Sequence, residues 1–145
     1  MPSRPEKSSG IDSEMAQRLL RAARQAAENA YVPYSHFPVG AAVLTGDGQI
    51  VTGANIENAS YGLTLCAERV AVFTAAAAGH REVRAVAIST PRHPGATPCG
   101  ACRQVLNEFR PAAEDLVVLL DGPNGIVELG LSELLPMSFG PRDLS

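Results

Sequence analysis

Apolar residues recur every three to four positions between residues 12 and 30. They form one stripe with a second beside it: Met15, Leu19, Ala22 and Ala26, then Leu20, Ala23 and Ala27. This spacing predicts an amphipathic helix, which Asp12 or Ser13 can cap at its start. Pro33 disfavours helical backbone in the residue before it, so we expect the helix to end by about Ala30.

Continuous apolar runs follow, and they are typical of strands covered on both faces. The first run spans residues 39–44, and Asp47-Gly48 then predicts a hairpin turn into a second strand over residues 50–54. Three more strands and three more helices are expected: strands over 83–90, 116–120 and 126–129, and helices over 66–78, from Cys99 to before Pro111, and over 131–135. Helices that alternate with strands predict a layered α/β fold, and the opening hairpin makes its sheet mixed.

Composition and charge narrow the function classes. The chain has 145 residues, 46% of them hydrophobic, which suits a single globular domain over residues 12–145 behind a flexible tail over residues 1–11. No apolar run reaches the roughly 20 residues needed to span a bilayer, and the polar start lacks a secretory core. We therefore expect a cytoplasmic protein. The net charge of −3, without a basic patch, argues against a nucleic-acid partner.

The candidate chemistry lies in the three cysteines, Cys66, Cys99 and Cys102. Cys99 and Cys102 share one face at the start of a predicted helix, and Cys66 opens a different helix. Three protein ligands leave the fourth position of a zinc ion open, which is the catalytic arrangement. Glu68 would carry protons beside it.

Two arginines stand next to these ligands. Helix starts favour thiolates, and three thiolates around Zn²⁺ carry a formal negative charge. From adjacency alone, Arg69 and Arg103 are candidates to offset that charge. The sequence leaves open which of the two matters more.

Cys-Ala-Glu-Arg at residues 66–69, followed by Pro-Cys-Gly-Ala-Cys-Arg-Gln at residues 98–104, resembles the zinc-dependent cytidine deaminases in their small, all-cysteine form. The resemblance extends over roughly residues 12–140. It implies a three-layer α/β/α sandwich around a five-stranded mixed sheet, with one Zn²⁺ per chain. It also implies hydrolytic deamination of cytidine and 2′-deoxycytidine to uridine and 2′-deoxyuridine plus ammonia, a step of pyrimidine salvage.

The same resemblance implies the substrate contacts, which involve Phe37, Asn55, Glu57, Ala67, Tyr61 and Phe139. In the family, the phenylalanine packs on the pyrimidine ring, and the asparagine and glutamate bind the ribose. Tyr61 and Phe139 would enter the pocket of a neighbouring chain in a homotetramer. Read without the resemblance, Phe37 suits an ordinary core position, and Asn55 and Glu57 suit a polar turn. Thr64-Leu65 departs from the pair that many relatives carry, so fine specificity stays open.

Other functions remain to be weighed. A non-catalytic zinc module needs a fourth ligand, and none of His36, His80 and His93 has a recognisable ligand spacing. A redox protein would leave Cys66 and Glu68 unexplained. A deaminase of a related nucleoside, such as blasticidin S, shares the zinc motif and is the alternative within the same class.

Overall fold

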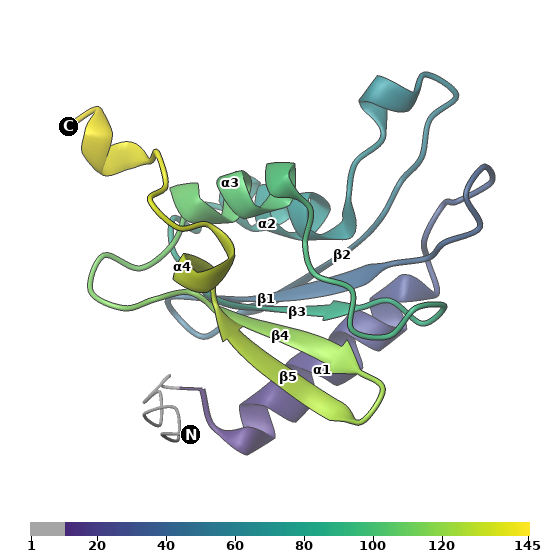
Figure 1. Cartoon of the computed structure of the whole chain (residues 1–145), viewed down its shortest axis with the longest axis horizontal. Coiled ribbons are helices and arrows are strands. Elements are labelled where there is room, and N and C mark those ends of the chain that lie inside the picture. Colours follow the sequence, from purple (N-terminus) through teal and green to yellow (C-terminus); the bar gives the residue numbers. More distant parts are fainter. Residues whose placement is uncertain (1–10) are drawn as a thin grey trace.

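A computed structural model describes residues 11–145, which form one sheet with helices on both faces (Figure 1). The strands are β1 (Gly40–Thr45), β2 (Ile50–Ala54), β3 (Val83–Ser89), β4 (Val117–Gly122) and β5 (Gly125–Gly130). Their order across the sheet is β2-β1-β3-β4-β5. β3 and β4 pair in parallel and the other neighbours are antiparallel, so the predicted five-stranded mixed sheet is confirmed.

One face of the sheet is covered by α1 (Ser13–Ala27). The Asp12 side chain caps it by accepting a hydrogen bond from the backbone N–H of Met15 at 2.8 Å, as predicted. The helix ends three residues before the predicted Ala30. Its last turn tightens, because the next amides bond to carbonyls three residues back, as Asn29 does to Ala26 at 3.0 Å.

The approach of α1 to the sheet is close where Gly40 begins β1. A Cβ at that position would lie 1.9 Å from the carbonyl oxygen of Ala23, so only glycine fits there. The apolar cluster beneath α1 includes Leu19, Leu20, Leu44 and Leu119. Every residue of β1 is buried, which confirms a strand covered on both faces.

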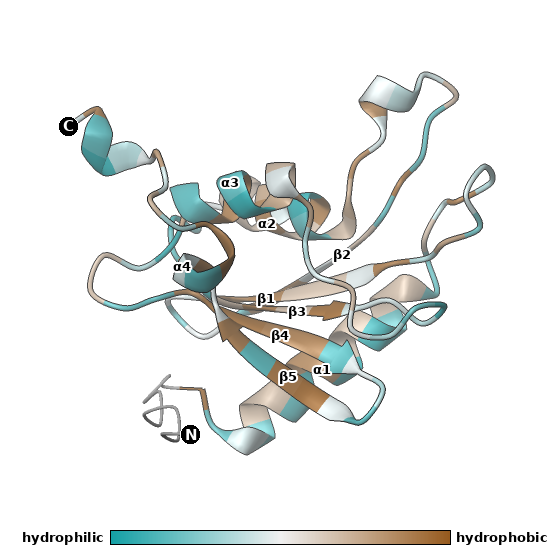
Figure 2. Ribbon diagram, in the orientation of Figure 1, coloured by the Kyte–Doolittle hydropathy of each residue, from teal (hydrophilic) through white to brown (hydrophobic). Residues whose placement is uncertain are grey.

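The opposite face carries α2 (Ala67–Ala77), α3 (Gly100–Glu108) and the short α4 (Leu131–Leu134), which completes the expected three-layer α/β/α arrangement. Small alanines let α2 pack close to the sheet, and Val72, Leu106 and Leu131 fill the space around them. Figure 2 shows mostly hydrophobic colouring along the central strands and mostly hydrophilic colouring on the turn near the C-terminus. The two cysteine-bearing helices therefore rest on a rigid sheet.

Boundaries differ from the sequence expectations by a few residues, and two short 3₁₀ turns were not expected, η1 (Tyr61–Leu63) and η2 (Pro141–Asp143). Residues 1–10 lie outside the described part, so the flexible tail expected over residues 1–11 stays a prediction. Ile11 itself packs against the cluster beneath α1. None of the helices within residues 11–145 is long and apolar enough to cross a membrane.

Candidate active site

The starts of α2 and α3 converge at the three cysteines. Cys66 is the N-cap of α2 and Cys99 is the N-cap of α3, while Cys102 is buried within the first turn of α3. The Sγ atoms of Cys66 and Cys99 lie 3.8 Å apart, and those of Cys99 and Cys102 lie 3.4 Å apart. All three ligand atoms lie within 4.8 Å of one another. The convergence that the sequence predicted is therefore present.

The geometry of this cluster fits a zinc ion. In a tetrahedral site with zinc–sulfur bonds of about 2.3 Å, neighbouring sulfurs lie about 3.8 Å apart. The cysteine separations of 3.8 and 3.4 Å are close to that value. Within the described residues, these three cysteines are also the group that could hold a metal. Three thiol ligands match a catalytic zinc site with one open position.

Arg69 is the cation that contacts the cysteines. Its Nη2 donates to the Sγ of Cys66 at 3.4 Å, and its buried Nε has no hydrogen-bond partner. Hydrogen bonding from the Cys102 thiol, with the Arg69 guanidinium adding to it, lowers the pKa of Cys66 to about 5. The pKa of Cys102 is raised by its hydrogen bond to Cys66 and by burial. The cluster thus favours a thiolate at Cys66 beside a positive charge.

Arg103 occupies a different place and makes its hydrogen bonds to other groups than the cysteines, so a part for it in offsetting the thiolate charge stays a prediction. Its Nε donates to the carbonyl of Pro98 at 2.7 Å, its Nη1 to the carbonyl of Leu134 at 2.8 Å, and its Nη2 to the hydroxyl of Thr97 at 3.2 Å. The guanidinium is directed at backbone carbonyls because a helix side chain at this position faces the loop before α3 and the end of α4. Arg103 therefore links the loop before α3 to the end of α4 through hydrogen bonds.

Glu68 lies on the first turn of α2, directly beside the cluster. Its side chain is only 5% exposed, and burial raises the pKa of its carboxyl above the ordinary value, with the negative charge of Cys66 adding to the shift. A carboxyl whose pKa is raised holds a proton more readily and can both accept and release one. Glu68 is therefore a candidate for proton transfer beside the cluster.

A pocket of about 180 Å³ opens beside the cysteines, and its wall includes Cys66, Ala67, Glu68, Cys99, Phe37 and Asn55. Asn55 holds the loop that carries Phe37. Its Oδ1 accepts from the backbone N–H of Val39 at 2.9 Å, and its Nδ2 donates to the carbonyl of Phe37 at 2.9 Å. The structure thus brings Phe37, Asn55 and Ala67 to the pocket that contains the candidate catalytic group.

Glu57 lies next to this wall but is not among the residues that line it. Its Oε1 accepts from the backbone N–H groups of Tyr34 and Ser35 at 3.0 and 3.1 Å. Hydrogen bonding from the Ser35 side chain is the main cause that lowers the pKa of Glu57. One carboxylate oxygen therefore supports the loop before Phe37, a contact that the sequence did not reveal.

Tyr61 and Phe139 lie outside the pocket of their own chain. The Tyr61 side chain is 76% exposed and makes an edge contact with Tyr34, with 6.0 Å between ring centroids. The Phe139 side chain is 61% exposed on the C-terminal segment, which extends from the body near α3 (Figure 1). Both rings are thus available to a second molecule.

Sequence reasoning missed part of the pocket wall, namely Ile88, Thr90, Ala96 and Thr97. Thr90 follows the end of β3, and its buried hydroxyl donates to the carbonyl of His93 at 2.7 Å. Ligands in α/β sheets bind outside the carboxyl ends of parallel strands, and that rule was the signal that points to Thr90.

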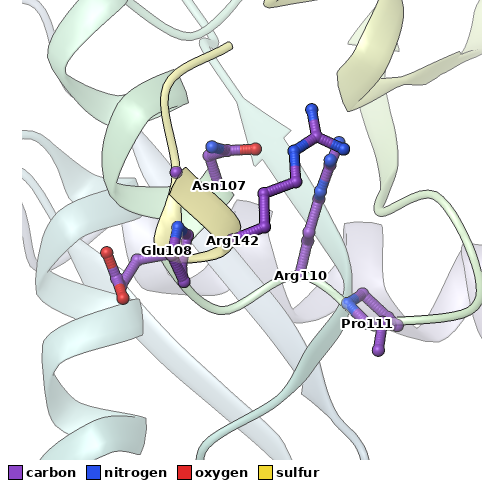
Figure 3. Close-up of a pocket in the computed structure, with 8 residues that line it drawn as sticks. Asn107, Glu108, Arg110, Pro111 and Arg142 are labelled. Carbon is purple, nitrogen blue, oxygen red and sulfur yellow. The ribbon is translucent and has the colours of Figure 1, made fainter. Parts of the chain in front are cut away.

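A second hollow of about 340 Å³ lies away from the cysteines, between the end of α3 and η2. In Figure 3, the guanidinium groups of Arg110 and Arg142 point the same way, and Glu108 points away from them. Asn107, Pro111 and Gly140 complete much of the lining. The hollow therefore separates part of the C-terminal turn from the end of α3.

Comparisons with known proteins agree with the site. Residues 13–120 match the family model described as "Cytidine and deoxycytidylate deaminase zinc-binding region". The chain is 52% identical over 130 residues to the cytidine deaminase of Halalkalibacterium halodurans, covering 89% of this chain and 97% of that protein. It is 48% identical over 122 residues to the cytidine deaminase of Mycobacterium tuberculosis, covering 84% of this chain and 87% of that protein.

Solved structures show the same relationship. The crystal structure of cytidine deaminase from Burkholderia pseudomallei superposes with a TM-score of 0.78 at 45% identity, covering 85% of this chain and 98% of that one. The structure of cytidine deaminase from Mycobacterium tuberculosis gives a TM-score of 0.73 at 45% identity, with coverage of 86% and 96%. Motif, geometry and similarity lead to one conclusion: this chain belongs to the zinc-dependent cytidine deaminase family.

Proposed function

We propose that this chain catalyses the hydrolytic deamination of cytidine and 2′-deoxycytidine to uridine and 2′-deoxyuridine, with release of ammonia. The observation that carries the proposal is the position of Glu68. This buried carboxyl shares the wall of one pocket with two of the three cysteines that could hold a zinc ion. A purely structural zinc site needs neither a pocket nor an adjacent proton carrier.

Zinc, when bound by the three thiolates, supplies Lewis-acid activation of a water molecule for addition to C4 of the cytosine ring. Glu68 accepts the proton that this water loses and delivers protons to N3 of the ring and to the departing amino group. Water and cytidine thereby give uridine and ammonia. The raised pKa of Glu68 suits this cycle, because the same carboxyl has to gain and lose a proton near neutral pH.

The pocket wall supports binding of a pyrimidine nucleoside. Phe37 offers an aromatic face to the base, and the Asn55 side chain holds the backbone on which Phe37 stands. Glu57 accepts two backbone hydrogen bonds through Oε1, and its Oε2 is the atom that we assign to a ribose hydroxyl. An anionic group at this place disfavours a substrate phosphate, so nucleosides should be preferred over nucleotides.

We also propose a homotetramer in which Tyr61 and Phe139 of one chain complete the pocket of another. The support is their exposure outside their own pocket, together with Leu63, Met137 and Leu144, which are exposed on the same two segments. Most soluble homo-oligomers are closed and symmetric, and a D₂ tetramer is one such arrangement. The three free thiols have to stay reduced to bind metal, which supports a role in cytoplasmic pyrimidine salvage.

The decisive experiment follows cytidine loss by ultraviolet absorbance and measures the ammonia released, on protein of known zinc content. We expect stoichiometric uridine and ammonia and about one zinc per chain. Blasticidin S, assayed in parallel, tests the alternative substrate class. Turnover of blasticidin S but not of cytidine would replace the proposed function, and bound zinc without deamination of either compound would favour a non-catalytic module.

A further inference from the structure

Two side-chain amides of α3 meet at a single backbone carbonyl of the C-terminal segment. The Nε2 of Gln104 donates to the carbonyl oxygen of Phe139 at 2.8 Å, and the Nδ2 of Asn107 donates to the same oxygen at 3.1 Å. The two residues are three positions apart, so they share one face of the helix. We call this pair the amide clamp. It belongs to the helix that begins at Cys99.

Both the nitrogen and the oxygen of the Asn107 side-chain amide form hydrogen bonds with this segment. It is only 4% exposed, and its Oδ1 accepts from the hydroxyl of Ser138 at 3.4 Å. Gly140 lies so close that a Cβ at that position would come within 2.7 Å of the Asn107 Nδ2. A buried amide without these partners would have unsatisfied polar atoms, which destabilises a fold. The Asn107 side chain and residues 138–140 therefore fit together in both shape and hydrogen bonding.

The large apolar side chains of the same segment are mostly exposed. Met137 is fully exposed, and the Phe139 ring is 61% exposed. Behind the clamp lies the hollow of about 340 Å³ that Asn107, Gly140 and Arg142 help to line (Figure 3). Two hydrogen bonds from α3 thus attach the backbone at Phe139. The arrangement orders the backbone under an aromatic ring that is mostly exposed on its own chain.

We propose that Gln104 and Asn107 are positioning residues that aim the Phe139 ring at the pocket of a neighbouring chain. The inference rests on the proposed function, in which Phe139 contacts the substrate of another subunit. The clamp acts through the backbone of Phe139 and does not touch the reacting atoms. It couples the Phe139 ring to α3, the helix that carries Cys99 and Cys102. One helix therefore positions two metal ligands of its own site and the ring that contacts the site of a neighbouring chain.

Loss of the clamp should affect substrate binding more than the chemical step. A freed segment spends less time with the ring in the binding position, which lowers the apparent affinity for substrate. Glu68 and the cysteines stay in place, because they are held by α2, α3 and the sheet. The expected signature is therefore a raised KM with a kcat that changes little.

The test compares Gln104→Met, Asn107→Leu and Phe139→Ala as full-length, zinc-loaded proteins with cytidine as substrate. Gln104 is exposed, so Gln104→Met keeps the fold and helix propensity while removing one donor. One lost hydrogen bond should raise KM about three- to tenfold, with kcat within about twofold of the original. Gln17→Met makes the same change at an exposed position of α1, on the opposite face of the sheet, and should leave KM unchanged.

The double variant Gln104→Met with Phe139→Ala gives the decisive comparison. If the clamp acts through Phe139, the double variant has the KM of Phe139→Ala alone. A defect in Phe139→Ala with normal KM in both clamp variants would overturn the clamp but not the shared site. Equal losses from Gln104→Met with and without the ring would also overturn it. A normal KM in Phe139→Ala would overturn the shared site and, with it, the purpose of the clamp.

Discussion

The Nη2 of Arg69 donates to the Sγ of Cys66 at 3.4 Å, across the first turn of the same helix. This contact places a permanent positive charge against a thiol whose pKa is already lowered. Hydrogen bonding to Cys66 in turn raises the pKa of Arg69. A centre of three thiolates and a divalent ion carries a net negative charge. We expect Arg69 to balance this charge, because its guanidinium contacts one of the three sulfurs.

Arg69→Gln should therefore weaken zinc retention. The glutamine keeps much of the length of the side chain but removes the charge, so the thiolates lose their compensation. We expect faster transfer of zinc to a chelator and lower activity, with partial recovery when zinc is added. Arg103→Gln is the matched control, because Arg103 ties backbone segments and is expected to retain zinc normally. Identical zinc transfer from Arg69→Gln and the original protein would contradict this role.

Glu68→Gln should separate metal binding from catalysis. The amide has nearly the same shape as the carboxyl, so about one zinc per chain should remain bound, as the three-cysteine site implies. Proton transfer is lost, and kcat should fall by several orders of magnitude. Metal analysis together with the cytidine assay checks both outcomes. Glu14→Gln, at an exposed position of α1, should be fully active. Normal turnover by Glu68→Gln would rule out its assigned role.

Stability should depend on pH through Asp121. Arg24 donates to its two oxygens from Nε and Nη2 at 2.7 Å each, and this contact is the main cause that lowers the pKa of Asp121. A carboxyl with a depressed folded pKa stabilises the fold above the unfolded value of about 3.9, and loses that contribution as pH falls through the folded pKa. Asp121→Asn should thus be less stable at neutral pH by up to about 1 kcal/mol.

Urea unfolding at a series of pH values checks this expectation. The difference between the original protein and Asp121→Asn should shrink as pH falls from about 4 through the depressed folded pKa, because the unfolded chain takes up the proton before the folded protein does. Arg24→Met should cause a similar loss, and the double variant should add little to either. A difference that stays constant at all pH values would show that Asp121 acts through its shape instead of its charge.

Nucleosides should be better substrates than nucleotides. A phosphate on the sugar would approach Glu57, whose carboxylate is kept ionised because its hydrogen bonds lower its pKa. We expect kcat/KM for cytidine to exceed that for CMP by at least about tenfold, which corresponds to roughly 1.4 kcal/mol. Steady-state assays of both compounds at one ionic strength provide the test. Comparable values of kcat/KM would count against the assignment of Glu57 to the sugar.

Assembly should be visible by light scattering. We expect about four times the chain mass of 15.2 kDa, unchanged across a dilution series. Truncation before Phe139 should raise KM while zinc content stays normal, because the ligands lie elsewhere. Removal of only Ser145 is the matched control and should leave KM near its original value. A fully active monomer at every concentration would exclude shared sites.

Much of the fold could be predicted from the sequence because its signals are local. The apolar stripe beside Asp12 predicts a capped helix, and Asp47-Gly48 between two apolar runs predicts a hairpin. Helix ends were less predictable. α1 stops at Ala27 because its final turn tightens, a choice between two nearly equal hydrogen-bond patterns that no residue pattern resolves.

In the candidate site, too, local spacing predicts one part of the arrangement and tertiary packing decides the other. The short spacing of Cys99 and Cys102 already places their side chains on one helix face. Cys66 and Cys99 are separated by 33 positions, and only the packing of α2 beside α3 on one sheet brings their sulfurs to 3.8 Å. The sequence by itself therefore determined which residue types could bind zinc and move a proton, because these are chemical properties of individual side chains.

Contacts between distant segments were decided by the tertiary structure alone. Adjacency suggested Arg69 and Arg103 equally, and each lies three or four positions after a cysteine at a helix start, so helix periodicity does not separate them. Arg69 meets Cys66, whereas Arg103 meets the carbonyl of Leu134. The amide clamp on Phe139 likewise joins positions more than thirty residues apart. Such pairings depend on how layers pack, and no local pattern in the chain records that.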